Sequence, residues 1–161
     1  SADIAWAPQS VTLRLTDNLD VSRGDLITPT TSTPPVTRDI DATVCHLTDQ
    51  PLRPGTRVLL KHTTRTVRAL VKDIPSRLTL NNLSHHPAPG HLNANDIGRI
   101  TLRTAEPLAL DPYATSRHTG SFLLIDPTDG TTLTAGMAGE AFGEAFAAGP
   151  GQQSDDEGWD F

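Results

Sequence analysis

The chain has 161 residues, of which 36% are hydrophobic and only 4% aromatic, with thirteen prolines and twelve glycines. This composition favours short strands and many turns over long helices, in one domain or one small domain with extensions. The formal net charge of −6 is uneven: residues 38–103 carry ten Lys or Arg against five Asp or Glu, and residues 104–161 carry one against ten. A basic domain followed by an acidic tail does not require a nucleic-acid partner.

The sequence also bears on the compartment. Cys45 is the only cysteine, so no disulfide can form within the chain and no oxidising compartment is implied. No apolar run approaches the ~20 residues that span a bilayer. The first residues lack the charged-then-apolar pattern of a secretory signal. We therefore expect a cytoplasmic protein with no membrane partner.

Residues 1–33 are expected to be part of a β-barrel domain followed by a linker. Val11 to Leu15 alternates apolar and polar side chains, as in a half-buried strand, and Asp20 to Ile27 indicates a turn leading into a second short strand. Two strands alone are marginally stable in water, so this piece needs a larger barrel to complete it. Thr28 to Pro35 has no apolar face and several prolines, which is typical of a stiff linker.

Residues 34–137 are predicted to be a second domain, all-β in class. Pro54-Gly55 marks a turn, His62-Thr63-Thr64 joins a hairpin, and the proline-rich residues 75–95 are expected to be a long loop. The pattern lacks a strong helix signal and favours a closed antiparallel Greek-key barrel of six strands, which has no exposed edges. The expected strands cover residues 40–47, 58–60, 67–71, 97–102, 122–125 and 131–137.

Residues 138–161 are expected to be an acidic, disordered tail. It opens with a tandem repeat of Gly-Glu-Ala-Phe over residues 139–146, and the repeated glycines disfavour a helix. Trp159 and Phe161 leave an alternative open, because aromatic residues in an acidic tail can form a docking motif.

The sequence predicts no catalytic, cofactor-binding or metal-binding residue. No phosphate-binding loop, nucleophile elbow or zinc-protease helix motif is present. Cys45 falls within a strand pattern, where a small buried side chain is expected rather than a nucleophile. Asp126 and Asp129 flank a Pro/Gly turn, where aspartate is favoured because it caps the backbone.

Two alternatives rest on clustered side chains. His85, His86 and His91 could bind a metal, although Asp96 is the only further ligand nearby and the spacing matches no strong zinc pattern. A basic hairpin could bind RNA, although it lacks aromatic residues for base stacking. Its cations are Arg57, Lys61, Arg65, Arg68 and Lys72.

Three stretches together resemble one known family. The first consists of residues 10–15 and 20–25, and the second of residues 59–62 and 66–69. The third consists of residues 95–98, 107–108, 111–113, 117–122 and 125–126, and includes Arg117-His118-Thr119-Gly120. Over roughly residues 8–137 they resemble the end of the second domain and the third domain of the large, GTPase subunit of bacterial sulfate adenylyltransferase. This subunit is related to elongation factor Tu. The chain departs from the family pattern at Ser116, where the pattern has Asn.

The resemblance implies that the chain is a piece of a GTP-dependent enzyme that makes adenosine 5′-phosphosulfate from ATP and sulfate. GTP and Mg would then bind in an N-terminal domain outside this chain, and no catalysis is expected from the chain alone. The implied partners are the small catalytic subunit and the GTPase domain of the parent chain.

The barrel is expected to act by contact between subunits and domains. The candidate interface or structural motif consists of Arg23, Arg68, Arg117, His118, Thr119 and Gly120. The alternative is a barrel like that of a translation elongation factor, contacting tRNA, since function is located in surfaces rather than in folds.

Overall fold

The computed structural model describes residues 4–6, 8–79 and 84–139. Within these residues the only regular elements are strands and one short helix, all located after residue 35. In chain order they are β1 (Val36–His46), β2 (Arg57–His62), β3 (Arg65–Thr79), β4 (Ser84–Pro87), β5 (Ile97–Ala109), α1 (Arg117–Gly120), β6 (Ser121–Ile125) and β7 (Thr132–Ala138).

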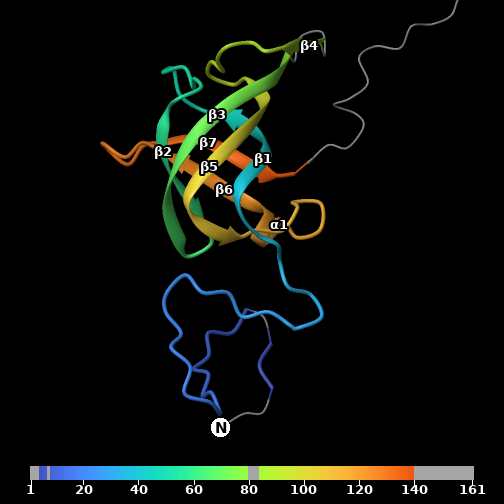
Figure 1. Cartoon of the computed structure of the whole chain (residues 1–161), viewed down its shortest axis with the longest axis vertical. Helices are drawn as coiled ribbons and strands as arrows, with labels where there is room; N and C mark the ends of the chain where they lie inside the picture. Colours follow the sequence, from blue (N-terminus) through green and yellow to red (C-terminus); the bar gives the residue numbers. More distant parts are fainter. Residues whose placement is uncertain (1–3, 7, 80–83, 140–161) are drawn as a thin grey trace, which may run out of the picture.

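Six of the strands form a closed antiparallel barrel, as predicted (Figure 1). The order around it is β2-β6-β7-β1-β5-β3, and the pairing of β3 with β2 closes the cylinder. β4 lies outside the cylinder and pairs only with the end of β3. Since every barrel strand has a neighbour on both sides, its backbone groups are hydrogen-bonded and no edge is left open.

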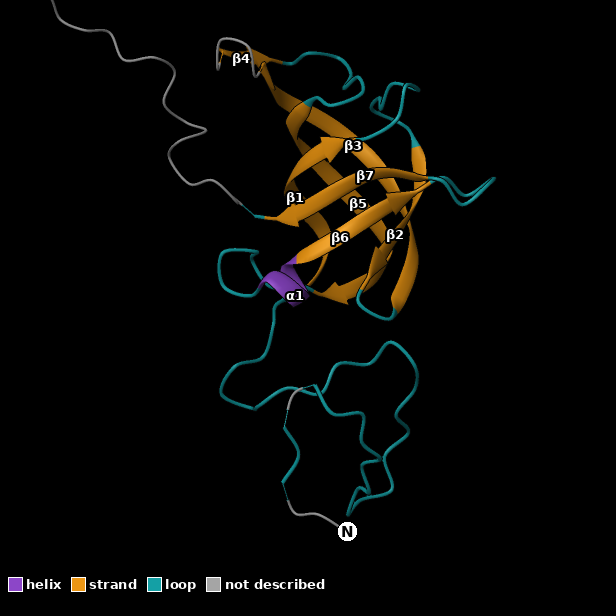
Figure 2. Cartoon of the chain, turned by 180° about the vertical axis from the view of Figure 1, so that it is seen from behind, coloured by secondary structure: helices purple, strands orange, loops and turns teal. Residues whose placement is uncertain are grey.

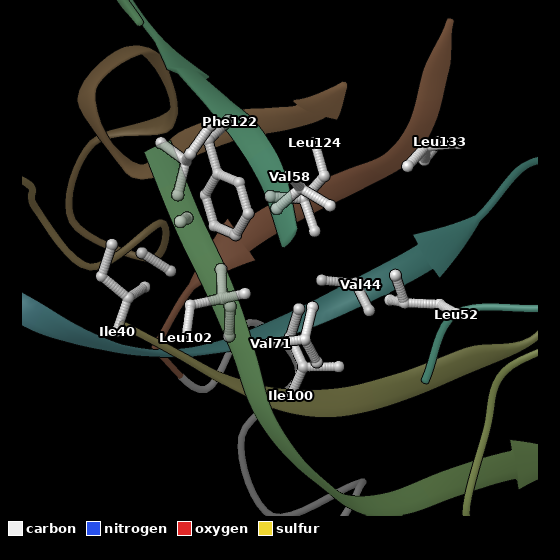
Figure 3. Packing of buried hydrophobic residues seen from close by; sticks show 14 of the residues in the cluster. Ile40, Val44, Leu52, Val58, Val71, Ile100, Leu102, Phe122, Leu124 and Leu133 are labelled. Atoms are coloured by element: carbon white, nitrogen blue, oxygen red, sulfur yellow. The ribbon is translucent and has the colours of Figure 1, made fainter. Parts of the chain in front are cut away.

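Alternation along the strands explains the core. In β2, Val58, Leu60 and His62 are buried while Arg57 and Lys61 are exposed, because successive side chains point to opposite faces of a sheet. The inward side chains of all six barrel strands form one hydrophobic cluster. Figure 3 shows Val58, Val71, Ile100 and Leu124 converging in the interior of the barrel.

Two long connections cross the ends of the barrel, which is the Greek-key feature expected from the sequence. The β1–β2 connection covers one end, where Leu52 and Leu92 exchange two backbone hydrogen bonds of 2.9 Å and are both buried. The β5–β6 connection, residues 110–120, covers the other end and contains α1 (Figure 2). Both ends are therefore closed by chain segments rather than open to solvent.

The predicted long loop over residues 75–95 is wrong in part. β3 continues through Pro75 to Thr79, and β4 forms within the same stretch. The register of β3 against β5 shifts on both sides of Asp73, so bulges interrupt the alternation that marks a strand in a sequence. β5 likewise extends beyond the predicted strand, to Ala109.

The N-terminal segment, residues 8–35, contains no strand in this structure. The strands expected at Val11 to Leu15 and toward Ile27 are not formed, and their apolar side chains are exposed. Figure 1 shows this segment as a long irregular excursion below the barrel. The predicted disorder of the tail concerns residues that lie outside the described part of the chain, apart from Ala138 and Gly139.

Candidate interface at the helix end of the barrel

The predicted motif at residues 116–120 forms the short helix α1 and its cap. Ser116 is the N-cap, with extended backbone, and its side chain accepts a hydrogen bond from the backbone N–H of Thr119 at 3.5 Å. Serine and asparagine are both favoured N-cap residues because each side chain offers an oxygen to the free N–H groups of the first turn. Ser116 can therefore cap this helix in the way that an asparagine would.

Thr119 links this helix to two other parts of the barrel. Its hydroxyl donates to the Asp111 carboxylate, with an Oγ1–Oδ2 distance of 2.6 Å. Its carbonyl accepts a hydrogen bond from the backbone N–H of Asp111 at 3.2 Å and another from Nε2 of His62 at 2.9 Å. Because a carbonyl can only accept, the Nε2 atom of buried His62 carries a proton.

Gly120 is buried where two backbone segments approach each other closely. A Cβ atom at this position would lie 2.5 Å from Cα and 2.6 Å from N of Tyr113. These are backbone atoms, so a larger residue cannot be accommodated by rotating a side chain. Thr119 and Gly120 thus hold the end of the barrel together.

Arg117 and His118 are the members of the motif that face solvent. Among the described residues neither has a hydrogen bond or an ion pair. The motif therefore has two parts, an internal lock (Thr119 and Gly120) and an exposed pair (Arg117 and His118).

His118 stands at the rim of a shallow groove that we call the α1 groove. The groove has a volume of about 490 Å³ and runs over the outer surface of β6 and β7. Its floor is apolar and its rim carries Lys61, Tyr113 and His118. Apolar floor residues include Cys45, Phe122, Leu123, Ala135 and Met137.

Arg68 lies elsewhere, on the outer face of β3, where it lines a second groove together with Arg57 and Arg103. Arg68, Leu70 and Lys72 all face outward. Arg23 is located in the N-terminal segment. Its neighbour Gly24 lies beside the Arg65 side chain, because a Cβ atom at position 24 would be 3.3 Å from Cγ of Arg65. The structure therefore brings residues 117–120 together and leaves Arg23 and Arg68 at separate places.

The other candidate side chains are distributed over the barrel. Cys45 is half-buried on β1 and forms part of the α1 groove. His86 is exposed on β4 and His91 is half-buried, while the side chain of His85 lies outside the described residues. Among the residues that the structure describes, no three His, Cys, Asp or Glu side chains are grouped so as to hold a metal ion. In the same residues no helix has the length and apolar character needed to cross a membrane.

The capping function predicted for Asp126 and Asp129 is confirmed. Asp126 Oδ1 accepts from the backbone N–H of Thr128 at 2.7 Å, and Asp129 Oδ1 accepts from that of Thr131 at 2.9 Å. Hydrogen bonds from the backbone and the side chain of Thr131 lower the pKa of the Asp129 carboxyl from its ordinary value of 3.8. Both carboxylates serve the β6–β7 turn.

Several residues of this end of the barrel were not among the predicted site residues. His62, Asp111 and Tyr113 occur in the stretches that carry the family resemblance, which was the available signal for them. Leu123 breaks the alternation of β6, because it is a large apolar residue at an outward position. Its side chain remains 37% exposed. Lys61 is directly opposite Leu123 on the neighbouring strand.

Comparison with known proteins agrees with this architecture. The model of the family described as "GTP-eEF1A C-terminal domain-like" matches residues 39–138, which is the barrel. Among solved structures, Sup35 complexed with GDP superimposes with a TM-score of 0.61 at 19% identity, covering 69% of this chain and 27% of Sup35. This likeness concerns the fold.

Two curated relatives extend the similarity beyond the barrel. The bifunctional enzyme CysN/CysC of Mycobacterium tuberculosis is 46% identical over 134 residues, which is 83% of this chain and 22% of the relative. Sulfate adenylyltransferase subunit 1 of Alteromonas mediterranea is 36% identical over 133 residues, 83% of this chain and 28% of the relative. The chain thus spans less than a third of the length of these relatives. Because the family model matches more than half of the chain, the chain belongs to the GTP-eEF1A C-terminal domain-like family.

Proposed function

We propose that this chain is the C-terminal interaction barrel of a sulfate-activating GTPase subunit and acts by contact rather than by catalysis. The observation that carries the proposal is its 46% identity over 134 residues to CysN/CysC, together with the similarity to sulfate adenylyltransferase subunit 1. A protein named as one subunit works with another. The barrel would bind the catalytic subunit that makes adenosine 5′-phosphosulfate, in the cytoplasm.

The α1 groove is the surface that suits this contact best. Its floor holds apolar side chains of β6 and β7, of which Leu123 is exposed and Ala135 and Met137 are half-buried, and its rim carries Lys61, Tyr113 and His118. An apolar centre with a polar, aromatic-containing rim is the usual anatomy of a protein interface. The internal lock of Thr119 and Gly120 fixes α1 beneath this surface, so the groove is rigid before the partner arrives and loses little entropy on binding.

Binding of the chain to the small catalytic subunit of sulfate adenylyltransferase, measured by calorimetry, tests the proposal. Leu123→Asp places a charge on the groove floor and should weaken binding at least tenfold, while Leu47→Asp serves as the matched control. Leu47 is also an exposed leucine, at the end of β1, and does not line the groove. Equal binding by both variants would contradict the α1 groove as the interface, and no binding by the unchanged chain would contradict the contact itself.

In this proposal GTP and Mg belong to a domain outside the chain. The chain alone should therefore not bind GTP, and micromolar binding in a fluorescent-nucleotide titration would contradict the proposal.

The N-terminal segment would complete the preceding barrel of the parent protein. Hydrogen exchange of a full-length relative tests this, since amides aligned with Val11 to Leu15 should be protected there and exposed in this chain.

The tRNA-binding alternative is not favoured. The resemblance to Sup35 is limited to the fold, at 19% identity, whereas a relative at 36% identity is named sulfate adenylyltransferase subunit 1. Two cations of the basic hairpin are also engaged within the barrel. Arg65 pairs with Glu106 at 2.7 Å, and Lys72 lies 3.7 Å from Asp39.

A further inference from the structure

The second groove combines arginines with exposed apolar side chains. It lies near the start of β2, whereas α1 lies near the end of that strand. We call it the arginine groove, and its volume is about 460 Å³. The strand registers explain its composition, because Arg57 pairs with Leu70 and Leu70 with Arg103, while Leu59 pairs with Arg68. Apolar and cationic side chains therefore alternate across the outer face of three strands, and Leu70 remains 38% exposed.

The arginines of this groove differ in their partners. Arg103 is paired with Asp39, whose carboxylate also lies near Lys72. Arg57 and Arg68 have no hydrogen bond or ion pair to any described residue. Two guanidinium groups beside an apolar floor can therefore bind carboxylates and a large apolar side chain together. Each arginine donates charged hydrogen bonds to a carboxylate, and such bonds are stronger than those between neutral groups.

The chain itself contains a segment of this chemistry. Residues 155–161 read Asp-Asp-Glu-Gly-Trp-Asp-Phe, with four carboxylates and two aromatic side chains. Residues 140–161 as a whole carry six acidic and no basic residues. We propose that residues 155–161 dock in the arginine groove of the same chain, with acidic side chains on Arg57 and Arg68 and an aromatic ring on Leu59 and Leu70.

The length of the connection permits this. β7 ends at Ala138, and residues 140–154 are available to join it to the docking segment. Fifteen residues have a maximum reach of about 50 Å, which exceeds the length of about 20 Å of a six-residue strand. A short tether gives the docking segment an effective concentration of about 1 mM at the groove, so an intrinsic Kd of about 100 µM keeps roughly nine-tenths of the tails docked.

Docking has a consequence for partners. The tail covers Arg57 and Arg68, so an acidic segment of another protein must displace it before binding there. Because the attraction is mainly between charged groups at the surface, it weakens as salt is raised. This inference does not depend on the function proposed above, which places the subunit contact in the α1 groove.

Fluorescence of the full chain tests the proposal. The chain has two tryptophans, and Trp6→Phe leaves Trp159 as the single reporter. Docking should shift its emission to the blue and lower its acrylamide quenching constant several-fold relative to a synthetic peptide of residues 152–161. Arg57→Glu with Arg68→Glu should remove both effects, as should high salt, while Arg53→Glu, an exposed arginine outside the groove, should leave them unchanged.

A second variant protects the test against misfolding of the barrel. Replacing Asp155, Asp156 and Glu157 by Asn, Asn and Gln changes only the tail and should release Trp159 to the same extent. If Trp159 is quenched in the full chain as in the peptide, or if the two groove substitutions leave its protection intact, the proposal is overturned. Protection that falls on dilution would also overturn it, since the tail would then occupy the groove of a second copy.

Discussion

The barrel and the N-terminal segment contain the same kind of sequence pattern and yet differ completely in structure. In β2, alternation of apolar and polar residues coincides with alternation of buried and exposed side chains. In residues 11–15 the same alternation leaves Val11, Leu13 and Leu15 exposed, without a strand. The difference is that each barrel strand is hydrogen-bonded to a strand on either side, whereas residues 11–15 pair with no strand among the described residues.

Alternation therefore indicates that a segment is suited to a half-buried strand. Whether the strand forms depends on the partner strands that the rest of the chain supplies. A strand gains stability from its cross-strand neighbours and from the face that it buries, and an isolated pair of strands is marginal. The exposed side chains of the N-terminal segment fit the proposal that further strands of the parent protein complete it.

The largest effect should separate the two regions directly. Leu60→Ala removes a side chain that is 0% exposed and leaves a cavity in the closed core. We expect a loss of about 3 kcal/mol in the free energy of unfolding. Leu13→Ala makes the same chemical change at a position that is 62% exposed, and its effect should stay within about 0.5 kcal/mol. Urea denaturation of both variants checks this, and similar losses would mean that the N-terminal segment is packed in solution.

A second prediction concerns the internal lock at the α1 end. Gly120→Ala places a Cβ atom against the backbone of Tyr113, so residues 111–120 must move. We expect a loss of about 2 kcal/mol in the free energy of unfolding, typical of overpacking. The exposed Ala114→Ser, in the same connection, is the control and should have little effect. A Gly120→Ala variant as stable as the unchanged chain would show that this end of the barrel is loose.

The third prediction separates the lock from the exposed pair. Thr119→Val keeps the side-chain shape but removes the donor to Asp111, and should lower the free energy of unfolding by about 1 kcal/mol. His118→Ala removes an exposed side chain that has no hydrogen bond or ion pair to any described residue, and should not change the free energy of unfolding. Thermal unfolding of the two variants checks this. Equal loss in both would mean that His118 belongs to the lock.

The sequence predicted the closed six-stranded barrel because its strands have clear alternation and strong turns, such as Pro54-Gly55 and residues 126–130. It did not predict β4 or the full length of β3, because bulges around Asp73 shift the alternation and Pro75 usually interrupts a strand. The resemblance directed attention to residues 117–120. It could not divide the locked pair from the exposed pair, because that division depends on Asp111, Tyr113 and His62, which only the fold brings to α1.

The smallest predicted effect lies in the β6–β7 turn. The pKa of the Asp129 carboxyl is lowered from 3.8 because the charged form accepts hydrogen bonds from Thr131. A carboxyl whose pKa is lower in the folded state stabilises the fold above its unfolded pKa, and this contribution disappears as the pH falls through the folded pKa. Asp129→Asn should therefore lower the melting temperature slightly at pH 7, and the difference from the unchanged chain should shrink as the pH falls below 3.8. Thermal melts over this range measure it. A difference that persists in acid would show that the turn depends on the shape of the side chain and not on its charge.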